Sequence, residues 1–281
     1  MDKKVAIITD SASNISNEDA EKYNIKIIPL RICFSDKTYL DRFDISWQEF
    51  YEKLEHEIPK TSLPSVKSIL DVLDSLKNEN YTDVIYIGMS SGLSGTYNFV
   101  DTIGREYDGL NFISVDTKTL SCGQGALVIA AAKELIKSKC IDKVVSIINE
   151  IRKKMTALFV LEDLTYLKKG GRIGKVAGSV GSMLHISPII TVNNDGVYET
   201  AAKSIGFKKA KDTLIKELKK RYEGSKVALS IVVGKGTDKT DDVITSIKSF
   251  CKIDSIMINV VTPVLGAHTG PGLLGIVAYN V

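Results

Sequence analysis

The first half of the chain alternates between short apolar runs and segments whose apolar residues recur every three or four positions. Apolar runs begin at Lys4 (KVAIIT), Ile25 (IKIIPLRICF), Val84 (VIYIGM) and Asn111 (NFISVD). Between them, the segment from Ser65 to Leu76 has one apolar stripe at helical spacing, and further helices are predicted from about Thr96 and over 120–139. Continuous apolar strands separated by helices are typical of a parallel sheet covered on both faces. This half is therefore predicted to be Rossmann-like, with right-handed crossovers.

The second half has a different rhythm. The strand-like runs PIITVNN and VYETAAK flank an Asp-Gly pair, which is a strong hairpin signal. Helices are predicted for about 142–154, 207–222 and 241–251, and strands for KVALSIVV, SIMINVV and the closing GLLGIVAYNV. The pattern predicts a second, smaller α/β domain with a mixed or antiparallel sheet, packed on the first. We place the boundary near Thr156, which gives an α/β chain of two domains, 1–155 and 156–281.

Length and composition are those of an ordinary globular protein. The 281 residues are 44% hydrophobic and 25% charged, and a chain of this size buries roughly three quarters of its unfolded surface. The net charge of +3 is too small to indicate a nucleic-acid partner. No apolar run reaches the roughly 18 residues of a membrane span, and MDKKVAIITDSASN is interpreted as a first strand and its loop, not as a signal peptide. The four widely spaced cysteines are interpreted as free thiols, so we expect a cytoplasmic protein.

Several cofactor and metal signatures are missing from the sequence. Gly234-Lys235-Gly236-Thr237 lacks the upstream glycine of a P-loop and is interpreted as a strand-to-helix turn. No G-x-G-x-x-G follows a strand with an acidic partner about 20 residues on. Pro59 excludes a helical H-E-x-x-H at His56, and the three histidines are far apart. We therefore expect no cofactor and no metal.

Two loops rich in hydroxyl side chains stand near predicted strands and helices. Thr61-Ser62-Leu63-Pro64-Ser65 opens a helix and could be a plain capping segment. Ser90-Ser91-Gly92-Leu93-Ser94-Gly95-Thr96-Tyr97 follows VIYIGM, at the carboxyl end of the sheet, where open parallel sheets bind ligands. Its glycines allow close backbone approach, and the following helix N-terminus favours an anion, although a capping role alone is the alternative. Because no Lys or Arg cluster is nearby in the sequence, the loop favours one carboxylate over a triphosphate.

Two glycine-rich segments carry the remaining candidates. In Leu265-Gly266-Ala267-His268-Thr269-Gly270-Pro271-Gly272, the glycines argue against a core histidine on a helix face. His268 could donate to a carboxylate and titrate near neutral pH. In Gly170-Gly171-Arg172-Ile173-Gly174, Arg172 offers planar donors for a carboxylate or phosphate, but it could equally be a helix C-cap partner. His56, placed in a charged helix, and His185, before a strand, are interpreted as structural.

Together these segments resemble the DegV family, whose members bind fatty acids and include the lipid-carrying subunits of bacterial fatty-acid kinase. The matching segments begin, in order, at Thr61, Ser91, Leu164 and Gly266. The resemblance extends from about Lys3 to Tyr279. Each segment alone is weakly specific, but four in this order are strongly specific. Leu63 stands where the family often has a polar residue, so we expect altered packing there and not lost binding.

The resemblance implies that one long-chain fatty acid, such as palmitate or oleate, occupies a tunnel at the domain interface. The carboxylate-binding residues map to Thr61, Ser94 and His268, and supporting residues to Ser62, Ser91, Gly95, Thr96, Thr269 and Arg172. The chain would be a non-catalytic carrier. Its partner would be a separate ATP-dependent kinase that converts the carboxylate to an acyl-phosphate for phospholipid synthesis, and a transient contact with a membrane surface fits such a role.

Two other functions compete with this one. In a stand-alone phosphotransferase or hydrolase, Ser94 would be the nucleophile and His268 the base. No acidic residue is placed to orient His268, however, and Ser94 lacks the G-x-S-x-G elbow. A DNA-linked regulator would need a basic face, which the small net charge does not indicate.

Overall fold

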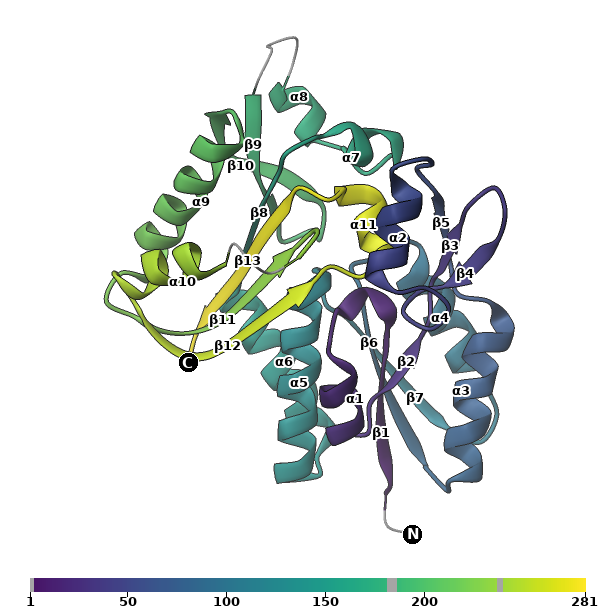
Figure 1. Ribbon diagram of the computed structural model, residues 1–281. Helices are drawn as coiled ribbons and strands as arrows, with labels where there is room; N and C mark the ends of the chain where they lie inside the picture. The colour runs from purple at the N-terminus through teal and green to yellow at the C-terminus, as the bar shows by residue number, and fades with distance from the viewer. Residues whose placement is uncertain (1–2, 181–185, 237–239) are drawn as a thin grey trace.

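The apolar runs of the first half build a four-stranded parallel sheet. The computed structural model, which describes residues 3–180, 186–236 and 240–281, orders these strands β2-β1-β6-β7. Their bounds are Lys26–Ile28 (β2), Val5–Asp10 (β1), Asp83–Gly88 (β6) and Asn111–Asp116 (β7). β6 is buried along its whole length, because helices cover both faces of this sheet (Figure 1). The predicted parallel sheet is therefore confirmed.

The helices on the two faces of this sheet have different neighbours. α3 (Val66–Asn78) and α4 (Thr96–Glu106) pack on one face, over a core that includes Tyr86 and Phe112. α5 (Ser121–Ser138) covers the other face, with α6 (Ile141–Lys154) alongside it. α5 also contacts a strand of the second sheet, so it lies between the two sheets (Figure 1).

A six-stranded mixed sheet, ordered β10-β9-β8-β13-β11-β12, forms the second lobe. Its strands are β8 (Thr156–Leu161), β9 (Ile186–Val192), β10 (Tyr198–Ile205), β11 (Lys226–Val233), β12 (Lys252–Val260) and β13 (Leu273–Asn280). Among the described strands of this sheet, β11 and β12 alone pair in parallel, and α10 (Asp241–Lys248) lies between them in the chain. The other pairs are antiparallel, including the β9–β10 hairpin. This sheet confirms the predicted mixed architecture.

Alternating side chains give this sheet two apolar faces. Leu158 and Ile276 point into a core closed by α9 (Phe207–Tyr222) and α10. Their neighbours Phe159 and Val277 point the other way, into the core shared with the first lobe. Because successive strand residues face opposite sides, the second face must be covered by the first lobe or by a ligand.

The run IKIIPLRICF, which we expected to be one strand, is two strands in different sheets. β2 ends at Ile28, and β3 (Arg31–Cys33) pairs with β4 (Thr38–Leu40) and β5 (Lys60–Ser62) in a small antiparallel sheet. Pro29 stands between the two strands and has no N–H to continue the first ladder. Thr61 therefore lies in a strand, and the cap of α3 is Ser65, whose Oγ accepts from the Ser68 N–H at 3.0 Å.

The histidines also differ from expectation. His56 is exposed, in a turn just after α2 (Trp47–Leu54), and not in a helix. His268 lies in a helix, α11 (Pro263–Thr269), where we expected a loop. Proline at the start of α11 and Gly270 after its end, at φ +67°, give this short helix clear boundaries. His185 lies outside the described residues.

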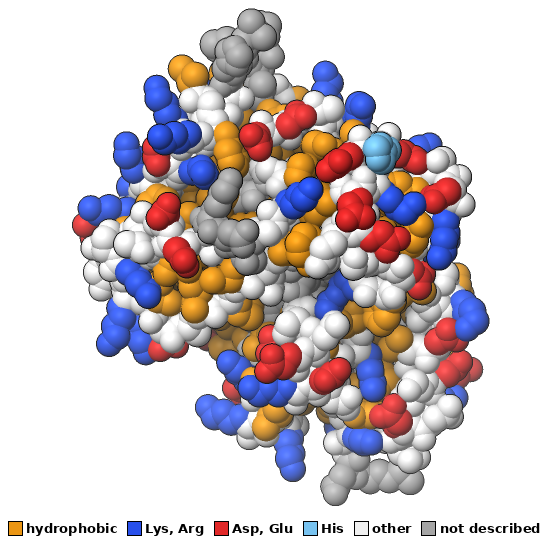
Figure 2. Space-filling model, viewed as in Figure 1, with side chains coloured by type: hydrophobic (Ala, Val, Ile, Leu, Met, Phe, Trp, Pro, Cys, Tyr) orange, Lys and Arg blue, Asp and Glu red, His pale blue; other side chains and the backbone are white. Residues whose placement is uncertain are grey.

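The remaining helices are short, and they complete the covering of the two lobes. They are η1 (Ser11–Ser13), α1 (Asn17–Lys22), α7 (Thr165–Lys169) and α8 (Val176–Val180). All four cysteines are free. Among the described residues, no helix combines the length and the apolar character that crossing a membrane requires. Figure 2 shows basic and acidic side chains interspersed over one face.

Candidate ligand-binding site

A cavity with mostly apolar walls lies where the two lobes meet. Its empty volume is about 860 Å³, part of which opens to solvent, and this is within the usual size range of small-molecule sites. The first lobe contributes Leu30, Met89 and Leu93, and the second contributes Phe159, Val232 and Val277. The three residues of the second lobe lie on the face of the six-stranded sheet that α9 and α10 do not cover. The alternation of the strands therefore supplies one wall of the cavity.

Polar side chains interrupt these walls in a few places. Of the residues predicted from the sequence, the cavity is lined by Thr61, Ser94, Arg172, His268 and Thr269. The other predicted residues lie outside the lining, and they are Ser62, Ser91, Gly95 and Thr96. The structure thus brings the principal candidates, from segments up to 207 positions apart, to the wall of one cavity.

Thr61 and His268 form a direct pair. Thr61 Oγ1 lies 2.8 Å from His268 Nε2. Arg31, on the neighbouring strand β3, holds the Thr61 segment: its Nε donates to the Leu63 carbonyl at 2.8 Å and its Nη2 to Ser62 Oγ at 3.1 Å. Ser62 therefore acts through Arg31, by fixing the backbone that carries Thr61.

The imidazole of His268 is neutral at neutral pH. Burial, and to a smaller extent the positive charge of Arg172, lower its pKa to about 4. The expectation that His268 titrates near neutrality is therefore wrong for this structure, because the side chain is buried and faces a cation. Its Nδ1 is buried and has no hydrogen-bond partner among the described residues. A carboxylate bound beside the ring would raise the pKa again.

Close packing of α7 against α11 determines where His268 sits. A Cβ on Gly170 would lie 2.1 Å from His268 Nδ1, and one on Gly270 would lie 2.4 Å from the Tyr166 ring. Both positions therefore require glycine. Arg172 donates from Nη1 to the Gly170 carbonyl at 2.6 Å, which closes the end of α7, and it also lines the cavity. Both roles considered for Arg172 are thus compatible with its position.

Ser94 is held by the start of α4. Its Oγ lies 2.8 Å from Thr96 Oγ1 and accepts from the Thr96 N–H at 3.2 Å. The Cβ position of Gly95 is 3.8 Å from the Leu63 side chain, so the Ser94 loop packs against the Thr61 segment. Among the described residues no hydrogen bond joins Ser94 to His268, so the nucleophile–base pair of a hydrolase is not formed.

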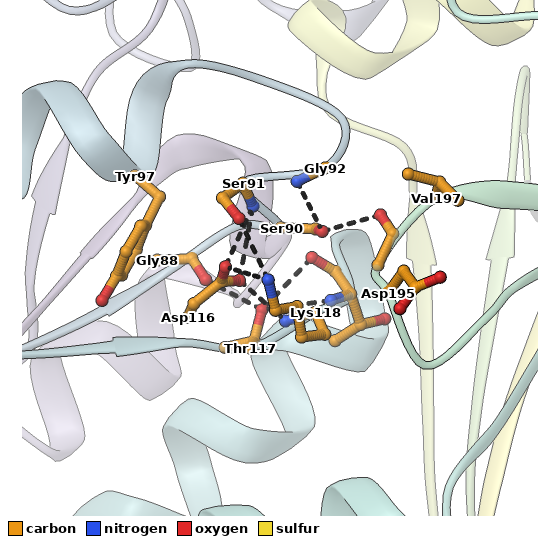
Figure 3. A network of polar contacts seen from close by, with 12 residues as sticks. Gly88, Ser90, Ser91, Gly92, Tyr97, Asp116, Thr117, Lys118, Asp195 and Val197 are labelled. Carbon is orange, nitrogen blue, oxygen red and sulfur yellow. Dashed lines mark hydrogen bonds and ion pairs between the residues drawn. The ribbon is translucent and has the colours of Figure 1, made fainter. Parts of the chain in front are cut away.

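The first half of this loop anchors the two lobes to each other. Ser90 Oγ donates to the Gly196 carbonyl in the β9–β10 hairpin at 2.7 Å (Figure 3). Lys118 Nζ donates to Ser91 Oγ at 3.1 Å and pairs with Asp116 at 2.8 Å (Figure 3). Folding therefore brings a lysine to a loop that has none nearby in sequence, but its charge is balanced by Asp116. The role of Ser91 is structural in this arrangement.

Two cavity residues were missed by the sequence analysis. Thr119 and Ser121, just before and at the start of α5, line the cavity, and their hydroxyls are buried without a hydrogen-bond partner among the described residues. Ser121 also has a left-handed backbone, at φ +54°. Both residues follow β7 at the carboxyl end of the parallel sheet. Open parallel sheets bind ligands at this end, and the same argument that selected Ser94 could therefore have selected them.

The polar end of the cavity is accessible from outside. Thr61, Arg172 and His268 also line an open groove, whose other residues include Lys60 and Lys169. The arrangement suits an amphipathic molecule with an apolar body in the cavity and an acidic group near this groove. Among the described residues, no cluster of His, Cys, Asp and Glu is placed to hold a metal ion.

The depressed pKa of His268 predicts acid sensitivity of the unliganded protein. Between pH 6.5 and about 4 the unfolded chain holds the proton more tightly, so stability falls as the pH falls. Asp41, whose pKa burial raises to about 7, acts in the opposite direction over the same range. The contribution of His268 is therefore isolated by comparing wild type with His268→Gln in urea unfolding at pH 7 and pH 4.5.

We expect the acid-induced loss of stability to be smaller in His268→Gln by roughly 2–3 kcal/mol. His56→Gln, at an exposed histidine, is the matched control and should change the pH profile little. Equal pH profiles for wild type and His268→Gln would show that the buried imidazole is not the acid-sensitive group.

Comparison with known proteins places the whole chain in one group. Residues 4–281 match the family described as "Uncharacterised protein, DegV family". A DegV domain-containing protein from Clostridium acetobutylicum is 37% identical over 278 residues, which cover 99% of each chain. The structure of a DegV-family protein from Thermus thermophilus, described for its fatty-acid binding, has a TM-score of 0.91 at 26% identity and covers 99% of this chain and 100% of that one. A stearic-acid-binding protein from Eubacterium ventriosum has a TM-score of 0.88 at 26% identity, with 98% of both chains covered.

Proposed function

The chain belongs to the DegV family, and on that premise we propose that it binds one long-chain fatty acid in the cavity between its lobes. The carboxylate would lie at Thr61, Ser94 and His268, and the tail along the apolar walls. The observation that carries this proposal is the cavity itself, which combines aliphatic and aromatic walls with a small group of polar side chains beside an open groove. The relatives that bind fatty acids share the fold over nearly their whole length.

The tail supplies most of the binding energy in this account. Burying about 15 methylenes at ~0.8 kcal/mol each gives a gross gain on the order of 12 kcal/mol before the costs of binding. Palmitate, stearate and oleate all have a hydrocarbon tail of about this length or longer. The head group then needs only enough contacts to place it, because a buried carboxylate without donors is strongly penalised.

The polar side chains meet that need with neutral donors. The Ser94 hydroxyl can donate one hydrogen bond to a carboxylate, and the bonded pair of Thr61 and neutral His268 keeps one further hydrogen free for the same purpose. Arg172 adds the positive charge, since it lies close enough to lower the pKa of His268. A carboxylate bound beside His268 would be attracted by the positive charge of Arg172 without forming a direct salt bridge with it.

We further propose that the bound carboxylate is presented to a separate ATP-dependent kinase in the cytoplasm. Three residues that line the cavity also line the open groove, so the carboxylate would be reachable from outside without release of the tail. The kinase would form an acyl-phosphate for phospholipid synthesis, with transient contact to a membrane surface at delivery. In this scheme the carrier itself provides no catalytic group.

Removing both head-group hydroxyls tests the proposed site. Thr61→Ala combined with Ser94→Ala should leave the fold intact and weaken fatty-acid binding about ten-fold, because each lost hydrogen bond is worth roughly 0.5–1.5 kcal/mol. Acyl-phosphate formation with the kinase and ATP should fall further, since the carboxylate is no longer oriented. Thr102→Ala combined with Ser146→Ala, two exposed hydroxyls on α4 and α6, is the matched control. Unchanged acyl-phosphate formation by the first double variant would refute the head-group role.

A further inference from the structure

A second pocket lies at the opposite end of α11 from His268. The first lobe contributes Ser16, Arg42 and Trp47, and the second lobe contributes Asn259 and Thr262. Its empty volume is about 730 Å³, part of it open to solvent. In Figure 1 the segment after β1 lies beside the end of β12, with α2 close to α11, and this is where the pocket forms. We call it the Arg42 pocket.

The walls of the Arg42 pocket are held together by hydrogen bonds across the lobes. Asn14 Nδ2 donates to the Val260 carbonyl at 3.1 Å, and the Thr262 N–H donates to Asn14 Oδ1 at 2.9 Å. Asn259 Nδ2 donates to the Asn14 carbonyl at 3.2 Å. The pocket is therefore built by the docked lobes and does not depend on a single loop.

Arg42 is only partly satisfied by the protein. Its Nη2 donates to Asn17 Oδ1 at 2.7 Å, whereas its Nη1 is buried and has no hydrogen-bond partner among the described residues. A buried guanidinium N–H without an acceptor is costly. The backbone of Arg42 is also left-handed, at φ +71°, which is uncommon for a residue other than glycine and tends to occur at functional positions.

Thr262 adds a second unsatisfied donor. Its side chain is 7% exposed, and Oγ1 has no hydrogen-bond partner among the described residues. Thr262 precedes α11, but its hydroxyl makes no capping bond to that helix. The hydroxyl is thus free to bind a ligand in the pocket that it lines.

The electrostatic balance of the pocket favours an anion. Among its described lining residues there is no Asp or Glu. The nearest carboxyl to Arg42 in sequence, Asp41, is fully buried, and burial raises its pKa to about 7, so it offsets the guanidinium charge only in part. Asp19 does not line the pocket, and its Oδ2 accepts from the Oγ of Ser16, a lining residue, at 2.9 Å. The N-terminal turn of α2, which begins at Trp47, adds a favourable helix dipole that Glu49 in the same turn offsets in part.

We propose that the Arg42 pocket binds a phosphate group. A guanidinium N–H and a buried hydroxyl, neither of which has an acceptor among the described residues, provide two donors, and these match an oxyanion with several acceptor oxygens. The phosphate would accept from Arg42 Nη1 and from Thr262 Oγ1, the two atoms that lack partners. It would come either as inorganic phosphate or as a monoester whose organic part packs on Trp47. This pocket adjoins the proposed fatty-acid cavity at Val261, which lines both, but phosphate binding there would not depend on the lipid.

Trp47 is the only tryptophan of the chain and reports directly on the pocket. Titrating inorganic phosphate into the whole protein, against potassium chloride at equal ionic strength, should give a saturable change in tryptophan fluorescence. Arg42→Gly should weaken phosphate binding at least about ten-fold, because a charge-assisted hydrogen bond is lost. Glycine suits the left-handed backbone at this position, so the fold should be retained. Lys208→Gln, an exposed lysine on α9, removes the same charge elsewhere and should have no effect.

A second variant keeps the test valid if Arg42→Gly misfolds. Thr262→Val removes a hydroxyl that has no partner in the structure, so it should weaken phosphate binding several-fold with little change in stability. Phenyl phosphate separates the two sources: tighter binding than inorganic phosphate indicates a monoester, and weaker binding indicates the free ion. The proposal is overturned if phosphate gives no saturable change beyond that of chloride. It is equally overturned if the change persists in both Arg42→Gly and Thr262→Val.

Discussion

Replacing Ala157 with phenylalanine is expected to lower the affinity for a long-chain fatty acid at least about 100-fold. Ala157 lies on β8 and lines the cavity. A phenyl ring there would occupy space that the tail needs, and excluding about four methylenes costs roughly 3 kcal/mol, or two orders of magnitude in affinity. The fold should persist, because the added atoms enter the cavity and not a close-packed core. Titration of the delipidated protein with oleate and palmitate measures the effect.

The matched control for Ala157→Phe is Val66→Phe. Val66 is 49% exposed at the start of α3, so the same aromatic group is added away from the cavity. This variant should bind fatty acid as wild type does. If Ala157→Phe folds normally and keeps its full affinity, the tail does not lie in the cavity between the lobes.

Replacing His268 with alanine is expected to reduce acyl-phosphate formation about 100-fold while reducing fatty-acid affinity less than about ten-fold. The tail supplies most of the affinity, and one lost head-group bond changes it little. Turnover by the kinase is more sensitive, because a carboxylate displaced by about 1 Å from its productive position can lose roughly two orders of magnitude in rate. In the proposed site His268 and Thr61, which pair where the cavity meets the groove, would together hold that position.

His268→Gln separates orientation from volume. Glutamine restores a donor of similar reach, so it should recover part of the kinase turnover that alanine loses. Retained lipid is measured by extracting it from the purified variants. Kinase turnover is measured by mixing each lipid-loaded variant with the kinase and ATP. Complete loss of lipid from a folded His268→Ala protein would contradict this division between tail and head group.

Periodic segments were predictable from the sequence, and segments defined by their tertiary partners were not. The helix Phe207–Tyr222 and the strand Lys226–Val233 are found as predicted, because their apolar spacing is continuous and their flanks are polar. The sequence predicts one strand where the structure has β2 and β3, because the run IKIIPLRICF is mostly apolar and only Pro29 marks the change of sheet. α11 forms where the sequence predicts a loop: its glycines are typical of loops, whereas Pro263 in its first turn is compatible with a helix start.

In the candidate site, too, some features could be predicted from the sequence and others depend on tertiary contacts. Thr61, Ser94 and His268 could be selected from short motifs, and they line one cavity. The neutrality of His268 could not be predicted, since it depends on burial against Gly170 and on Arg172, about 100 positions away. The hydroxyls of Thr119 and Ser121 carry no motif of their own. The place of these two residues on the cavity wall depends on how the second lobe packs against α5 and the end of the parallel sheet.

The most direct test of the account is the mass of the purified protein under native and denaturing conditions, with identification of whatever is released. The account predicts a native mass that exceeds the chain by one long-chain fatty acid, and that this excess disappears on denaturation. A protein without this excess, which also fails to take up added oleate or palmitate, would contradict fatty-acid binding in the cavity.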